Sequence, residues 1–147
     1  IIICRRSPKD TGLSIFQHPL QAQSYANNQT DLANYFIKVS KLIDHYLNIL
    51  DKSCVEVIYE NLVTSPDAYI PELLLSLDLT ISAACLNPEQ NKRAVFTPSS
   101  TQVRQAINSR AIGKFQKFEP YLSELFSPLS ELELIHKTKI YKNENSL

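Results

Sequence analysis

The sequence predicts a helix-rich α/β fold. A continuous apolar run at residues 1–4 leads directly into a helix start, which is the pattern of a buried strand, a tight turn and a helix. Residues 54–59 form a second candidate strand. Between the two strands, apolar residues recur three and four positions apart over residues 30–50, which predicts a long amphipathic helix. Strands that alternate with helices indicate the α/β class.

The first predicted helix has a clear start. Ser7 can serve as N-cap, Pro8 takes the first helical position, and Asp10 follows three residues after the cap. The polar residues 17–29, which include Pro19, predict a loop after this helix.

The second half of the chain has a weaker pattern. We predict a turn at 60–66, a helix at 66–77, a long irregular segment at 81–100, helical segments at 101–108 and 113–126, and a flexible tail at 130–147. The predictions of the turn and the irregular segment are based on proline and polar residues, and those of the helices are based on capping residues and apolar spacing.

Composition excludes several classes of protein. The 147 residues suit one domain, and fifteen basic side chains balance fifteen acidic ones, so the net charge gives no long-range attraction for nucleic acid or an anionic membrane. The apolar runs are far shorter than the roughly 20 residues that span a bilayer. The three cysteines lie far apart, so we expect them to be reduced and buried, with neither a disulfide framework nor a zinc site.

The turn after the first strand is a candidate anion site. It places Arg6 beside the free N–H groups of a helix start, and Ser14 follows two turns after Ser7. On spacing alone, the alternative is favoured: a surface arginine at a strand end and a helix hydroxyl bonded to a carbonyl.

Residues 6–14 (RSPKDTGLS) resemble the Arg-(Asp/Asn)-Pro-x-Asp-x-x-x-Ser stretch of sulfotransferases that use 3′-phosphoadenosine 5′-phosphosulfate (PAPS), in particular the bacterial, tetratricopeptide-linked and tyrosylprotein types. The resemblance implies that Arg6 and Ser14 hold the 3′-phosphate of the nucleotide. Ser7 replaces the usual Asp or Asn and is an equally good N-cap. Residues 57–62 (VIYENL) resemble the strand end of the same family, which implies that Tyr59 lies near the adenosine; the alternative is a core tyrosine at the sheet edge.

Two later segments continue the resemblance. Residues 96–105 are similar to a hydroxyl-rich turn, which implies that Ser99 and Ser100 face the nucleotide, although either could simply cap a helix. Residues 108–115 resemble a late Ser-x-Gly-(Arg/Lys)-Trp segment, with Phe115 in place of Trp. By this resemblance Arg110, Gly113 and Lys114 close over the 3′-phosphate, with Gly113 expected at positive φ. The alternative is a plain helix terminus with a solvated Lys114.

The resemblance implies a fold and an activity for the whole protein. Residues 1–129 would be the C-terminal part of a three-layer, P-loop nucleotide-kinase-like fold with parallel strands that lacks its N-terminal strand-loop-helix. The enzyme would transfer a sulfuryl group from PAPS to an acceptor hydroxyl or amine, without a metal, and leave adenosine 3′,5′-bisphosphate. The 5′-phosphosulfate loop and the catalytic base would precede Ile1, so we expect no catalytic residue here and no activity from this chain alone.

Two other functions stay open. The same strand-turn-helix could hold a phosphate in another nucleotide-dependent transferase, such as a kinase. The chain could also be a truncated, non-catalytic remnant of an enzyme or a helical interaction module. The acceptor, whether protein, glycan or small molecule, is not specified by any motif.

Overall fold

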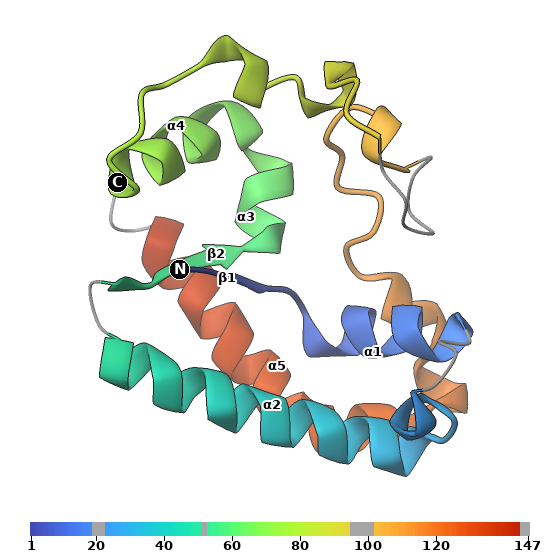
Figure 1. The fold of residues 1–147 in the computed structure, drawn as a ribbon. Helices are drawn as coiled ribbons and strands as arrows, with labels where there is room; N and C mark the ends of the chain where they lie inside the picture. Colours follow the sequence, from blue (N-terminus) through green and yellow to red (C-terminus); the bar gives the residue numbers. More distant parts are fainter. Residues whose placement is uncertain (19–22, 51–52, 95–101, 145–147) are drawn as a thin grey trace.

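A computed structural model describes residues 1–18, 23–50, 53–94 and 102–144. It confirms the α/β class: the chain is mostly helical around a small parallel sheet (Figure 1). Strand β1 (Ile2–Arg5) pairs with β2 (Val55–Ile58), with Ile2 opposite Val55 and Arg5 opposite Ile58. Both strands therefore end at the same edge of the sheet.

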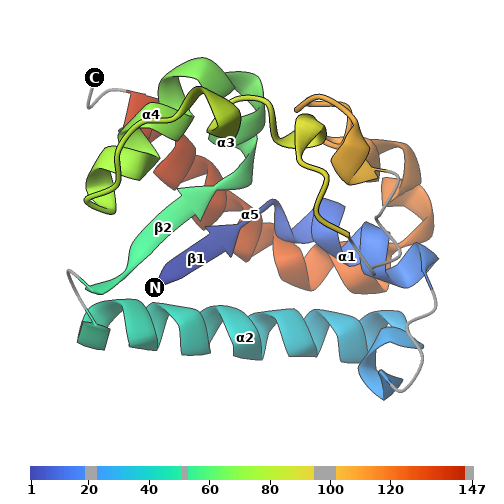
Figure 2. The ribbon, with the colours of Figure 1, turned by 45° about the horizontal axis from the view of Figure 1, so that its top comes forward.

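The connection between the strands follows the prediction closely. Helix α1 (Pro8–Gln17) begins after Ser7, whose hydroxyl accepts a hydrogen bond from the Asp10 N–H at 3.2 Å. A short 3₁₀ turn, η1 (Ser24–Ala26), precedes α2 (Gln29–Leu50), which confirms the long helix predicted at 30–50. Figure 2 shows α2 running along one side of the sheet, with α3 and α4 on the other.

The predicted turn at 60–66 is wrong, because α3 (Tyr59–Thr64) begins directly at the end of β2. This helix is too short to show a helical period in the sequence. Helix α4 (Pro66–Ser76) confirms the helix predicted at 66–77. It lies beside β2, and its Tyr69 hydroxyl accepts a hydrogen bond from the Ile58 N–H at 3.0 Å.

The segment after α4 is irregular, as predicted, and contains the 3₁₀ turns η3 (Ala83–Cys85), η4 (Pro88–Gln90) and η5 (Gln102–Arg104). The helix predicted at 101–108 is wrong, since η5 is its only helical turn among the described residues. The helix predicted at 113–126 is instead a 3₁₀ segment, η6 (Lys114–Tyr121), followed by the first turn of α5.

Helix α5 (Ser123–Glu144) corrects the prediction of a flexible tail after residue 129. Its buried positions are Leu125, Phe126, Leu129, Glu133 and His136, which keep the three-and-four spacing of a packed helix face. Because two of the later inward positions are polar, the sequence shows no continuous apolar stripe there.

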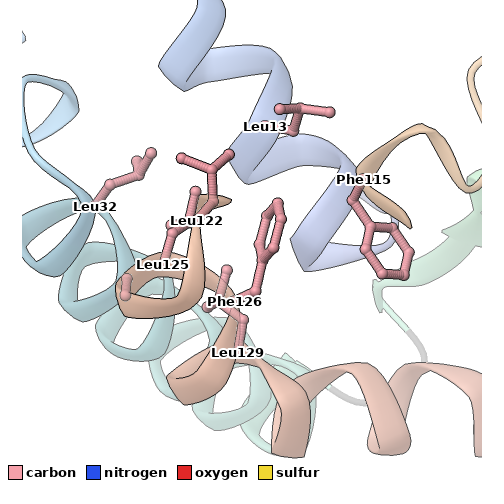
Figure 3. Close-up of a cluster of buried hydrophobic side chains, with 8 residues drawn as sticks. Leu13, Leu32, Phe115, Leu122, Leu125, Phe126 and Leu129 are labelled. Carbon is pink, nitrogen blue, oxygen red and sulfur yellow. The ribbon is translucent and has the colours of Figure 1, made fainter. Parts of the chain in front are cut away.

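The hydrophobic core lies where α5 packs on α1, α2 and η6 (Figure 3). Eight buried residues from these elements and the residue before α5 form it: Leu13, Leu32, Ala33, Phe115, Leu122, Leu125, Phe126 and Leu129. The rings of Phe115 and Phe126 meet edge to face, with centroids 5.8 Å apart. This contact anchors the start of η6, and with it the segment before η6, on the core.

Burial of β1 differs from the prediction of a strand covered on both faces. Ile2 is 49% exposed and Cys4 is exposed, and because side chains alternate along a strand, these two lie on one face of β1 that is left uncovered. The expectation that all three cysteines are buried is also wrong, since Cys85 is exposed and Cys54 is partly exposed.

Candidate functional site

A cavity of about 600 Å³ lies between α3 and the segments around η4, η5 and the start of η6. Its walls include Tyr59 at the start of α3, the apolar side chains Leu62, Val63, Val103 and Ile107, and four basic residues, Arg93, Arg104, Arg110 and Lys114. None of the described residues that line it is acidic. A cavity with an aromatic ring, an apolar wall and a basic rim suits an anionic ligand that also has a flat apolar part.

The structure brings together three of the predicted site residues in this cavity. Tyr59, Arg110 and Lys114 all line it, although they come from motifs about 50 residues apart in the sequence. Arg6 does not line this cavity, but it contacts two residues that do. An Arg6 Nη donates a hydrogen bond to the Ala111 carbonyl at 2.9 Å, and its guanidinium carbon is 4.9 Å from the centroid of the Tyr59 ring. Arg6 therefore connects the end of β1 to two residues that line the cavity.

Asp10 holds the Gly113 segment against α1. Its two carboxylate oxygens accept hydrogen bonds from the Gly113 N–H at 2.6 Å and from the Phe115 N–H at 3.0 Å. Asp10 is 2% exposed, so its bond to Phe115 is shielded from water, while its bond to Gly113 is partly buried. Gly113 has φ of 72°, which confirms the positive φ predicted there. A nearby ion pair joins Lys9 Nζ to Glu119 at 3.1 Å.

The other predicted residues are not brought to the cavity. Ser14 is partly buried on α1 and does not line the cavity, and its carbonyl oxygen lies 2.8 Å from His18 Nδ1. Ser99 and Ser100 lie outside the described residues. That Arg6 and Ser14 bind the same phosphate group thus stays a prediction.

Arg93 and Arg104 were missed as site residues, although the sequence contains a signal for them. Residues 90–118 hold six of the fifteen basic side chains and none of the fifteen acidic ones. In a chain without net charge, such a stretch carries a local positive charge that favours an anion. Arg104 is also fixed in place, since one of its Nη groups donates a hydrogen bond to the Arg93 carbonyl at 2.7 Å.

A buried polar cluster lies behind Arg6 and Tyr59, and we call it the Glu60 cluster: Ser7, Glu60, Glu133 and His136. Each of its four residues is less than a tenth exposed. Glu60 accepts from the Ser7 N–H at 2.8 Å and lies 2.7 Å from His136 Nε2, while the Ser7 hydroxyl donates to Glu133 at 2.8 Å. The cluster joins the ends of both strands to α5.

Burial alone would raise the pKa of Glu60. The hydrogen bonds from His136 and from the Ser7 N–H, together with the attraction of His136, outweigh that effect and hold the pKa of Glu60 below its ordinary value of 4.5. Glu60 is therefore ionised in the folded protein at neutral pH.

We expect the free energy of unfolding to decrease as the pH falls below about 4.5, because the unfolded chain then takes up a proton at Glu60 while the folded state still holds this carboxylate ionised. A carboxyl whose pKa is lowered by folding stabilises the protein above its unfolded pKa and loses that contribution as the pH falls through its folded pKa. Urea unfolding of the wild type and Glu60→Gln between about pH 6 and pH 3 measures this. The same acid dependence in Glu60→Gln as in the wild type would contradict it. Glu131→Gln, an exposed carboxyl on α5, is the control.

Comparisons with known proteins place the chain in no established family. No family model matches it. An uncharacterized protein of Aquifex aeolicus (strain VF5) is 24% identical over 135 residues, which cover 89% of this chain and 18% of that relative. The chain thus spans less than a fifth of the length of the relative it matches.

Two further features concern membrane spans and metal sites. Within the described ranges, no helix combines the length and apolar character needed to cross a membrane. Across the same residues, no group of three or more His, Cys, Asp or Glu side chains could hold a metal ion.

Proposed function

We propose that this chain is the C-terminal, nucleotide-binding part of a PAPS-dependent sulfotransferase with a P-loop nucleotide-kinase-like fold. The observation that carries the proposal is the basic cavity that Tyr59, Arg110 and Lys114 form together. These residues were chosen from two separate sequence motifs, so their meeting at one cavity supports a common ligand. Arg93 and Arg104 also line the cavity, and their positive charges support binding of an anionic ligand independently of any family resemblance.

The residues present fit the donor nucleotide. Tyr59 and the apolar wall suit the adenine, which needs a flat apolar contact, and the basic rim suits the phosphate groups. The role of these residues would be to bind and orient the donor, which carries the sulfuryl group to be transferred. The acceptor, a hydroxyl or an amine, would be bound by other parts of the protein.

Calorimetry of the full-length protein with adenosine 3′,5′-bisphosphate tests the proposal. We expect saturable binding of one equivalent, and we expect Arg6→Ala to weaken it by about 2 kcal/mol, the range for a lost charge-assisted contact. Arg6 supports the Tyr59 ring and the Ala111 segment, so its loss disturbs two walls of the site. An unchanged affinity would contradict the assignment of Arg6.

Competition separates the proposal from its alternatives. If ATP displaces labelled bisphosphate as well as unlabelled bisphosphate does, the protein is another nucleotide-dependent transferase, such as a kinase. If neither nucleotide binds, the chain is a remnant or an interaction module. Transfer of sulfuryl from PAPS to an acceptor by the full-length protein would establish the enzyme itself.

A further inference from the structure

The Glu60 cluster lies beside the candidate site, just beyond the end of each strand. Arg6 and Tyr59 are adjacent in sequence to Ser7 and Glu60, and the Ser7 N–H donates to Glu60 Oε1 at 2.8 Å. We infer that Glu60 is a positioning residue, which sets the placement of the Arg6 guanidinium over the Tyr59 ring and so shapes the ligand cavity. This inference rests on the proposed function for the identity of the ligand, whereas the contact between Arg6 and Tyr59 does not depend on that function.

The carboxylate of Glu60 is held at both oxygens. Oε1 accepts from the Ser7 N–H, and Oε2 lies 2.7 Å from Nε2 of His136 on α5. Glu60 is 8% exposed and His136 is 5% exposed, so water does not compete for these bonds. A carboxylate fixed in this way links Ser7, the second residue after β1, to the first turn of α3.

That link matters because it lies directly beside the contact between Arg6 and Tyr59. The sheet register ends at the pair of Arg5 and Ile58, one residue short of both. Beyond this pair, the described contacts between the two chain segments are the Arg6–Tyr59 stacking contact and the Ser7–Glu60 hydrogen bond. If the Ser7–Glu60 hydrogen bond is removed, the Arg6–Tyr59 contact loses the adjacent bond that holds the two segments together.

Glu133 provides a matched comparison within the same cluster. It is similarly buried, at 6% exposed, and it accepts from the Ser7 hydroxyl at 2.8 Å. It has no hydrogen bond with α3 among the described residues. A purely structural cluster would make Glu60 and Glu133 equivalent, whereas a positioning role makes Glu60 distinct.

The experiment measures two properties of the full-length protein for Glu60→Ala, Glu60→Gln and Glu133→Ala. The first is the affinity for adenosine 3′,5′-bisphosphate by calorimetry, and the second is the ring signals of Tyr59 in NMR spectra without ligand. We expect Glu60→Ala to weaken binding by about tenfold or more and to shift the Tyr59 signals. Glu60→Gln keeps an oxygen that can accept from Ser7, so its affinity should stay within about threefold of wild type. Glu133→Ala should lower stability, with affinity within about threefold and Tyr59 signals unchanged.

The inference is overturned if Glu60→Ala binds as the wild type does, or if Glu133→Ala loses affinity to the same extent. Should Glu60→Ala not fold, Glu60→Asp replaces it, because its shorter side chain keeps the charge but cannot reach both Ser7 and His136. If the wild type does not bind the bisphosphate at all, the proposed function fails, and the Tyr59 signals alone decide. A shift in the Glu60 variant and none in Glu133→Ala then supports the positioning role, and any other pattern refutes it.

Discussion

Replacing Asp10 with alanine should destabilise the protein by about 3 kcal/mol, because one buried and one partly buried N–H group lose a charged acceptor. These are the N–H groups of Gly113 and Phe115, which Asp10 binds at 2.6 and 3.0 Å. The segment that carries Arg110 and Lys114 would then be released from α1, so ligand binding should weaken as well. Urea unfolding gives the stability change, and hydrogen exchange at Gly113 and Phe115 shows whether the loss is local.

Asp67→Ala is the control for this substitution. Asp67 also lies in the first turn of a helix, α4, but is exposed, so its removal tests the helix-dipole contribution alone. We expect it to cost no more than about 1 kcal/mol. Protected Gly113 and Phe115 amides in Asp10→Ala would show that Asp10 does not hold the segment.

Reversing two charges of the cavity, Arg104→Glu together with Arg110→Glu, should weaken bisphosphate binding by about a hundredfold or more, which corresponds to about 3 kcal/mol. Each substitution replaces an attraction for phosphate with a repulsion at the rim of the cavity. Both side chains are exposed, so the fold should tolerate the change. Calorimetry at two salt concentrations measures the effect.

Lys92→Glu with Lys117→Glu is the matched control. These lysines belong to the same basic stretch, are exposed, and do not line the cavity, so the double substitution changes the net charge by the same amount. We expect it to reduce affinity by less than about fivefold, and less still at high salt. Equal losses from the two double variants would mean that a diffuse basic surface, and not the cavity, binds the ligand.

Local sequence patterns predicted the helices that have either a long apolar period or clear capping residues. Helix α2 shows a long apolar period, and α1 has Ser7 and Pro8 at its start, so both were predicted closely. Helix α3 has only six residues, too few for a period to appear. The second half of α5 was missed because Glu133 and His136 occupy inward positions, where they are stabilised by partners that the local sequence does not reveal.

The residues of the candidate site could be predicted where they lie in a recognisable local sequence motif. Tyr59, Arg110 and Lys114 came from the family resemblance, and the structure places them at one cavity. Arg93 and Arg104 could have been found from the absence of acidic residues in 90–118. The role of Asp10 could not have been predicted from the sequence, because its partners at 113 and 115 lie more than 100 positions away and no local pattern connects them.

The contacts of α5 also set the order in which the protein can fold during synthesis. Ser7 binds Glu133, 126 positions later, and Leu13 is covered by a core that α5 and the residues just before it largely supply. On the ribosome, β1 and α1 therefore emerge well before α5. Until α5 is made, Leu13 and Leu32 lack the part of their core that α5 supplies, which slows folding and favours aggregation. Chaperone binding to nascent chains that stop before Ser123 is the expected result of this topology.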